Sequence, residues 1–195
     1  MKSSLVNMVL SLGIITVVAA GLLSWIYTIT EAPIEQAKLD KQIEAVRAVT
    51  PEFDNDPVAD AVEITPAGED KALKVFPARK NGELVGAAVE SYSAAGFSGD
   101  IKLIYGFDLN GTITGYAVME HAETPGLGAK MDKWFTPEGK GNVIGLNPTE
   151  SALTVSKDGG QVDAITAATI TSRAFLDALN RASTAFSQLK ADESN

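Results

Sequence analysis

A long uncharged run opens the chain. Ser3 to Thr30 contains no charged residue, and Leu5 to Ile29 is mostly Leu, Ile, Val, Ala and Gly. As a helix, these 25 residues would reach about 37 Å, enough to cross a hydrocarbon core of about 30 Å with some tilt. The alternative is a cleaved signal peptide, but its apolar core usually has about 7–15 residues followed by a small-x-small site. We expect residues 1–30 to form an uncleaved transmembrane anchor, with Trp25 and Tyr27 near the membrane interface.

The charges around this run favour one orientation. Lys2 and the terminal amine precede it, whereas Glu31 follows it and Lys38 and Lys41 come later. The positive-inside tendency then predicts a single-pass protein of the cell (inner) membrane. Its N-terminus would be cytoplasmic, and residues 31–195 would lie on the periplasmic or extracellular side.

Residues 31–60 have the pattern of a helical stalk and linker, and a packing helix is the other interpretation of the helical part. Thr30-Glu31-Ala32-Pro33 is typical of a helix cap and first turn, where Pro is tolerated. A second helix is predicted from there to about Ala48, with Leu39, Ile43 and Val46 on one face. Thr50 to Pro57 then reads as an acidic linker.

From about residue 61 the pattern changes to short strands. Asn81-Gly82 and Asn110-Gly111 are two-residue hairpin signals, each in a matched frame over residues 81–89 and 110–118. The frame recurs after 29 residues, which predicts two similar hairpins in one antiparallel sheet. A strand with one buried face is predicted from the alternation of Ile101, Leu103, Tyr105 and Phe107.

The C-terminal segment has helical spacing. Its apolar positions fall on one face: Phe175, Leu179, Ala182, Phe186 and Leu189. The fold class is therefore predicted as α+β, a single N-terminal transmembrane helix followed by a twisted antiparallel sheet domain with flanking helices. That domain would cover residues 61–195.

Charge and composition exclude several functions. All basic side chains except Lys2 follow the apolar run, so the remainder has 15 basic and 25 acidic residues. This balance argues against nucleic acid as a partner. The chain has no Cys, which excludes disulfides, thiolate metal sites and cysteine-bound iron–sulfur clusters. One His and scattered carboxylates give no metal-ligand spacing.

The stretch from Asp163 to Ser172 carries the first candidate site. It combines an acid, small residues and hydroxyls just before the C-terminal helix, which should begin between Thr166 and Thr171. A helix N-terminus favours phosphate, and a Thr hydroxyl there can be esterified. The alternative is that these hydroxyls only cap the helix.

The second candidate is the loop His121 to Lys130. Pro125 and two glycines end the preceding strand, and Gly126 and Gly128 permit positive φ and close approach by a flat ligand. The spacing fits neither a P-loop nor a dinucleotide fingerprint. A purely structural turn is the alternative, as it is for His121; core packing is the alternative for Trp134 and Phe135, which follow the loop.

Both segments resemble one family. Asp-x-x-Thr-Ala-Ala-Thr (163–169) resembles the flavinylation motif Asp-x-x-Ser/Thr-Gly-Ala-Thr, whose last Thr carries FMN through a phosphoester. Glu-Thr-Pro-Gly-Leu-Gly (123–128) resembles the FMN-binding domain of the Rnf electron-transport complex. The Na⁺-translocating NADH:quinone reductase shares this domain, which would cover about residues 75–185 here. The short chain favours the G subunit of Rnf, and Ala167 departs from the usual Gly.

The resemblance implies a cofactor and partners. FMN would be attached to Thr169, and the other cofactor-binding residues would be Asp163, Thr166, Ala167, Ala168, Thr171, Ser172, Glu123, Thr124, Gly126, Leu127 and Gly128. The chain would be an electron carrier, not catalytic alone, in a ferredoxin:NAD⁺ oxidoreductase that moves Na⁺ or H⁺. Its partners would be the other membrane and iron–sulfur subunits, a flavin transferase and, through the anchor, membrane lipid. The alternatives are the quinone-reductase FMN subunit and a membrane-anchored binding or assembly module without flavin.

Overall fold

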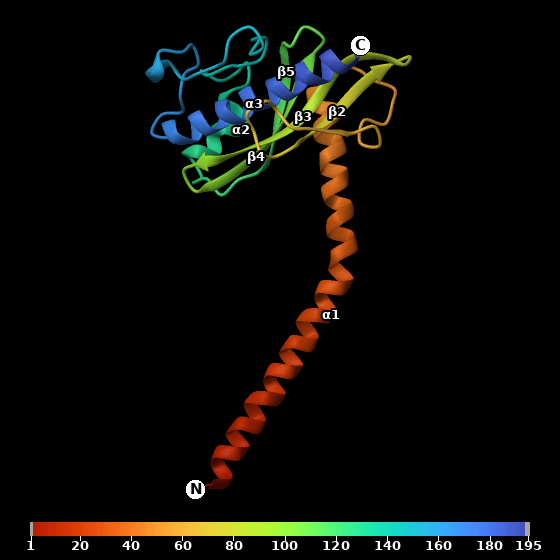
Figure 1. Ribbon diagram of the computed structural model, residues 1–195. Helices are drawn as coiled ribbons and strands as arrows, with labels where there is room; N and C mark the ends of the chain where they lie inside the picture. The colour runs from red at the N-terminus through yellow and green to blue at the C-terminus, as the bar shows by residue number, and fades with distance from the viewer. Residues whose placement is uncertain (1, 194–195) are drawn as a thin grey trace. The chain divides into compact units, whose positions relative to one another are not determined.

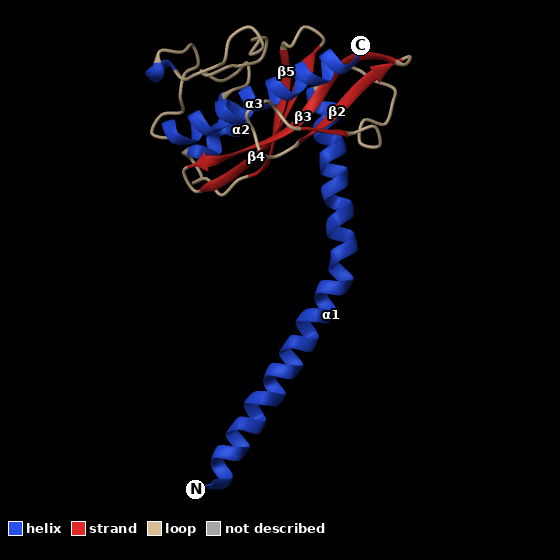
Figure 2. Ribbon diagram, in the orientation of Figure 1, coloured by secondary structure: helices blue, strands red, loops and turns tan. Residues whose placement is uncertain are grey.

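The computed structural model describes residues 2–193 and shows one long helix at the start of the chain (Figures 1 and 2). Helix α1 (Lys2–Val49) is continuous, so the predicted break and new helix at Thr30–Pro33 are wrong. The Thr30 hydroxyl donates backward to the Ile26 carbonyl at 2.8 Å, as Thr does inside helices, and therefore does not cap a new one. Pro33 lies inside α1, where it removes one backbone hydrogen bond.

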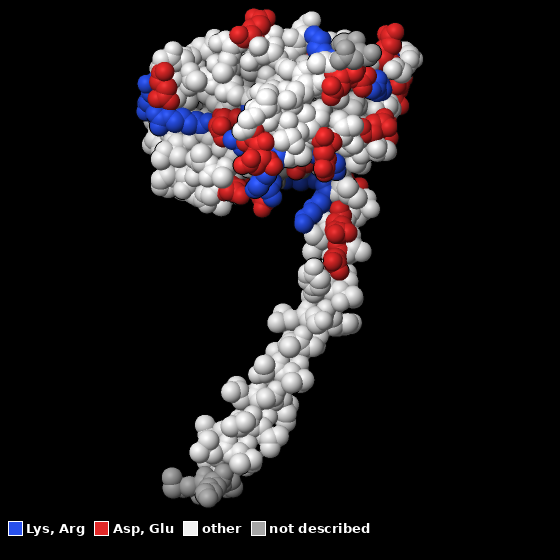
Figure 3. All heavy atoms as spheres, viewed as in Figure 1, with Lys and Arg blue, Asp and Glu red and all other residues white. Residues whose placement is uncertain are grey.

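Helix α1 includes a segment near the N-terminus that is long and apolar enough to cross a membrane. On the face drawn in Figure 3, charged side chains lie on the C-terminal unit and the C-terminal part of α1, and the described residues of the apolar run show none. The chain divides into two compact units, one ending at Lys41 and one beginning at Gln42.

The second unit is built on a five-stranded antiparallel sheet in the order β1-β2-β3-β4-β5. Its strands are β1 (Val62–Ile64), β2 (Leu73–Lys80), β3 (Glu83–Gly96), β4 (Gly99–Asp108) and β5 (Ile113–Glu120). With the helices, this confirms the predicted α+β class.

Both predicted hairpins form. Asn81 and Gly82 have φ values of 54° and 84° and join β2 to β3 in a two-residue turn. The β4–β5 hairpin has a longer connection, Leu109 to Thr112, so the predicted two-residue turn at Asn110-Gly111 is wrong. Asp108 Oδ1 closes this longer turn by accepting from the Asn110 and Thr112 amides, and of the two predicted turn residues only Gly111 has a positive φ, 85°. The repeated frame therefore supplies β3 and β5, which pair with opposite edges of β4.

Helix α3 (Thr169–Glu193) covers one face of the sheet, and its predicted apolar face is buried. Phe186 stacks on Phe107 of β4 with ring centroids 5.2 Å apart. Tyr105 donates a buried hydrogen bond of 2.8 Å to the Phe175 carbonyl of α3. These contacts fix α3 over the centre of the sheet.

The other face of the sheet packs on the last two turns of α1. Val46 and Val49 are buried there with Ile104 of β4, whereas Leu39 is exposed. The approach is close enough to require glycine, because a Cβ at Gly106 would lie 1.8 Å from the Val49 carbonyl oxygen. The end of α1 is thus part of the C-terminal fold.

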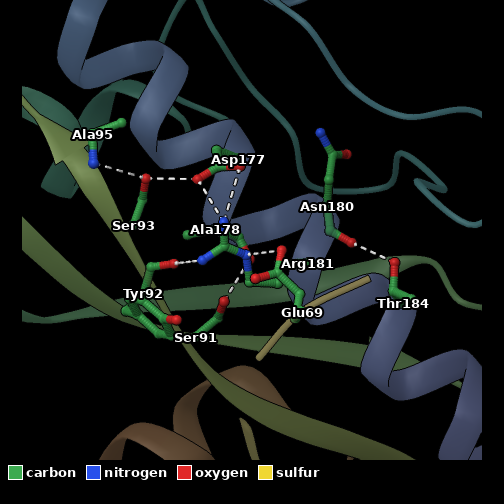
Figure 4. Close-up of polar contacts among 10 residues, drawn as sticks. All are labelled: Glu69, Ser91, Tyr92, Ser93, Ala95, Asp177, Ala178, Asn180, Arg181 and Thr184. Atoms are coloured by element: carbon green, nitrogen blue, oxygen red, sulfur yellow. Dashed lines mark hydrogen bonds and ion pairs between the residues drawn. The ribbon is translucent and has the colours of Figure 1, made fainter. Parts of the chain in front are cut away.

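Polar contacts also fasten α3 to β3 (Figure 4). The Ser91 hydroxyl donates to the Ala178 carbonyl at 2.8 Å, and the Ser93 hydroxyl donates to the Asp177 carboxylate at 2.7 Å. Arg181 of α3 donates to the Tyr92 carbonyl of β3 at 3.2 Å. Together they set the position of α3 along the sheet and hence the position of its first residue, where the candidate site lies.

Candidate functional site

One open cavity of about 320 Å³ brings the two candidate motifs together. The β3–β4 turn, the loop after β5 and the start of α3 all contribute to it. Its lining residues are Phe97, Glu123, Thr124, Leu127, Gly128, Ala167, Ala168, Thr169, Ile170 and Thr171. Two segments about 40 residues apart in the sequence therefore share one site.

Glu123 joins the three segments. Its side chain is only 5% exposed; Oε1 accepts a hydrogen bond of 3.0 Å from the Ser98 amide, and Oε2 accepts one of 2.7 Å from the Thr171 hydroxyl. Gly128 packs against this pair, since a Cβ there would lie 2.3 Å from Glu123 Oε2 and 2.7 Å from Thr171 Oγ1. The glycine is needed here for close packing against protein atoms.

A tight turn precedes Gly128. The turn runs from Thr124 to Leu127 and is closed by a hydrogen bond of 3.1 Å from the Leu127 amide to the Thr124 carbonyl. Pro125 occupies its second position, and Gly126 occupies its third position with a φ of 79°. Pro followed by a positive-φ Gly is the pattern of a type II turn. Gly126 shapes this turn and does not line the cavity.

The entry into α3 is an unusual turn. Ala167 has a φ of 63°, in the left-handed region that favours glycine. The Ser172 hydroxyl accepts from the Ile165 amide at 2.9 Å and donates to the Ala168 carbonyl at 3.0 Å. This geometry explains why the resembling motif has Gly at the position of Ala167. The hydroxyls of Thr171 and Ser172 bond to Glu123 and to this turn, and not to the free N–H groups of the first helical turn.

Thr169 is the first residue of α3, half-buried at the cavity. Its Oγ1 accepts a hydrogen bond of 3.0 Å from Lys157 Nζ. Lys157 lies in the short 3₁₀ helix η2 (Ser156–Asp158). Sequence reasoning missed this lysine because no spacing rule connects an exposed loop lysine with a helix start 12 residues later.

Four predicted residues lie outside the lining: Asp163, Thr166, Ser172 and Gly126. The Asp163 carboxylate accepts from the Ser156 hydroxyl at 3.1 Å, and its carbonyl accepts from the Trp134 indole N–H at 2.8 Å. Thr166 is exposed and Ser172 is buried. Asp163 and Ser172 therefore support the turn rather than face the cavity.

The other residues considered near the loop have structural contacts. Phe135 is fully buried and stacks on Phe175 with centroids 4.0 Å apart. Trp134 ends the short helix α2 (Met131–Trp134), which follows the 3₁₀ helix η1 (Gly128–Lys130). His121 accepts at Nδ1 from the Glu123 amide at 3.1 Å. Phe135 is thus a core residue, and His121 orders the loop.

The cavity has an apolar rim that the sequence reasoning found only in part. Phe97, Leu127 and Ile170 are 69%, 42% and 47% exposed and line the same cavity, and apolar side chains exposed together are more informative than single ones. Ligand sites are mostly apolar with a few placed polar groups, and their volumes begin at about 300 Å³. An exposed apolar rim, a hydroxyl at a helix N-terminus and a nearby ammonium fit a flat ring carrying a phosphate. The residues present therefore fit FMN.

Comparison with known proteins agrees with this site. The family model of the FMN-binding domain matches residues 96–184, which include every residue lining the cavity. The protein is thus of the FMN-binding domain class.

Named relatives extend the similarity over nearly the whole chain. The G subunit of the ion-translocating oxidoreductase complex from Methanosarcina acetivorans is 38% identical over 93% of this chain and 94% of that protein. Proteins of the same name from Aliivibrio fischeri and Vibrio cholerae serotype O1 are 34% and 33% identical, over 93% and 89% of this chain and 87% and 86% of their own lengths. The chain belongs to this family of G subunits of ion-translocating oxidoreductase complexes. The predicted family membership is confirmed.

Proposed function

We propose that the protein carries FMN as a phosphoester on Thr169 and serves as an electron carrier in a membrane ion-translocating oxidoreductase complex. The observation that carries this proposal is the place of the Thr169 hydroxyl. Thr169 is the first residue of the 25-residue helix α3, and it lines the cavity to which both motifs contribute. Family membership and the matched FMN-binding domain support the same cofactor.

The chain's residues divide the work of holding the cofactor. The phosphate would lie at the N-terminus of α3, where unpaired N–H groups and the helix dipole favour negative charge. The apolar rim of Phe97, Leu127 and Ile170 would contact the ring and exclude water from it. FMN accepts electrons in pairs and can release them singly, and the protein supplies its position and surroundings.

A covalent link suits an exported domain. With the orientation favoured by Lys2, residues after the span lie on the periplasmic or extracellular side, where lost FMN would be diluted. A flavin transferase would attach it: the Thr169 hydroxyl would lose its proton and form the P–O bond, while a nucleotide leaving group on the phosphorus of the activated FMN donor departs. Because the chain has no Cys, cluster-bearing partners must supply iron–sulfur chemistry, and ferredoxin:NAD⁺ oxidoreduction coupled to Na⁺ or H⁺ movement would belong to the assembled complex.

Peptide mass spectrometry of the full chain, co-produced with a flavin transferase, tests the attachment. Wild type should gain the mass of one FMN less water on the peptide containing Thr169, and Thr169→Val should not. Thr184→Val is the matched control, because Thr184 is exposed on α3 and lies outside both motifs and the cavity lining. Flavin that remains covalently bound to Thr169→Val would refute the assignment.

The same samples address the alternatives. Wild type that stays unmodified, while a control substrate is flavinylated, would favour a binding or assembly module without covalent flavin. Co-purification with ferredoxin-type cluster subunits would support the Rnf type, and their absence would favour the quinone reductase.

A further inference from the structure

We infer that Lys157 is the cationic partner of the phosphoester at Thr169. This inference rests on the proposed function, because it concerns the phosphate that Thr169 would carry. Lys157 Nζ donates to Thr169 Oγ1 at 3.0 Å, from a segment outside both recognised motifs. In the ester, Oγ1 bonds to phosphorus, and the charged non-bridging oxygens lie one bond farther out. A small rotation of the exposed lysine side chain brings its ammonium to one of them.

The charge of Lys157 is available for an anion. Within the described residues 2–193, its ammonium forms no ion pair within 4.0 Å, and the group that it contacts is a neutral hydroxyl. The neighbouring carboxylate is already engaged: Asp158 accepts two hydrogen bonds of 2.7 Å from Arg173. Arg173 therefore holds the pKa of Asp158 below its ordinary value, and Lys157 contributes to the same shift.

The surroundings make a local cation useful. The chain has a net charge of −9, and Glu123 lies in the lining of the same cavity. Both Glu123 oxygens accept hydrogen bonds, which spread its charge toward Ser98 and Thr171. An added phosphate would still meet a predominantly negative domain, and a nearby ammonium would offset that repulsion.

The turn that carries Lys157 is fastened at both sides. Asp158 is clamped to Arg173, one turn along α3 from Thr169. On the other side, the Ser156 hydroxyl donates to Asp163 Oδ1 at 3.1 Å. The aspartate of the flavinylation-like motif thus contacts the residue next to Lys157, which keeps the lysine beside Thr169.

A comparison of flavin-loaded and unloaded full-length protein in detergent tests the inference. Each chain is produced with and without the transferase, and loading is read by peptide mass. Loading should raise the melting temperature of wild type more than that of Lys157→Met, by about 2–4 °C for one charge-assisted hydrogen bond. Lys157→Arg should keep most of this rise in melting temperature on loading. Lys140→Met should keep all of it, because Lys140 is exposed and lies outside the cavity lining.

High salt distinguishes an electrostatic contribution of Lys157 from a contribution of its packing. The part of the increment that depends on Lys157 should shrink at 1 M salt, where the screening length is about 3 Å. If Lys157→Met folds but cannot be loaded while Lys157→Arg can, the need for a cation is likewise supported.

Other outcomes overturn the inference. Equal increments in wild type and Lys157→Met would show that the ammonium does not bind the ester. Failure of both lysine variants to load, while Lys140→Met loads, would show that loading requires the lysine side chain itself and not a cation at position 157, which is contrary to the inference. Absence of FMN on Thr169 in wild type would instead overturn the proposed function, so the two failures can be told apart.

Discussion

Replacing Ala167 by Gly should stabilise the protein. Ala167 has a φ of 63°, and the left-handed region costs an L-residue about 1–2 kcal/mol. Glycine removes that cost but loses about 0.5–1 kcal/mol through greater freedom of the unfolded chain. The side chain is exposed, so little packing is lost. The expected net gain is about 0.5–1 kcal/mol in the free energy of unfolding.

Urea unfolding of the full chain in detergent, followed by circular dichroism, measures this gain. With a slope of about 1–3 kcal/mol per molar urea, the midpoint should rise by a few tenths molar. Ala168→Gly is the control, because Ala168 is buried and has no positive φ. It should be destabilised by about 1 kcal/mol through lost apolar contact and backbone entropy. If Ala167→Gly were destabilised to the same extent as Ala168→Gly, the argument from backbone strain would be wrong.

Two further substitutions test the site's construction. Gly128→Ala should lower the free energy of unfolding by about 1–3 kcal/mol, because the added Cβ would lie 2.3 Å from Glu123 Oε2. Gly126→Ala adds its methyl to open space at φ 79° and should cost less; an equal or greater loss in thermal unfolding would contradict the packing argument. The hydrogen bond from Arg173 lowers the pKa of Asp158 in the folded protein below its ordinary value of 3.8. The ion pair therefore stabilises the fold at pH values above 3.8, and this stabilisation is lost as the pH falls through the lowered pKa of the folded state. Asp158→Asn should therefore narrow the stability difference between neutral pH and pH below 3.8, and an unchanged acid dependence would show that this pair is not involved.

Elements set by local pattern were predictable. The hairpin at Asn81-Gly82 forms because few other dipeptides adopt two successive positive φ values at so little cost. The buried face of α3 follows from the spacing of Phe175, Leu179 and Phe186, since a helix repeats its faces every 3.6 residues. The error at Thr30–Pro33 has a local cause too, because Thr30 bonds backward to Ile26 when the preceding residues are already helical.

Burial on both faces of the sheet was less predictable. The alternation of Ile101, Leu103 and Tyr105 indicated one buried face, yet Ile104 is also fully buried. Its cover comes from the end of α1, more than 50 residues earlier in the chain. Packing between distant segments leaves no periodic signal in either of them.

The sequence by itself determined the apolar span, the two hairpins, the C-terminal helix and the two motifs of the site. Each depends on residues close together in the chain, whose backbone preferences act locally. Only the tertiary structure decided that Glu123 joins both motifs, that Phe97 lies on the cavity rim and that Lys157 meets Thr169. It also decided that Asp163 supports a turn outside the cavity. These relations depend on how α3 and the loops pack on the sheet, and such contacts form between segments whose sequences do not encode one another's positions.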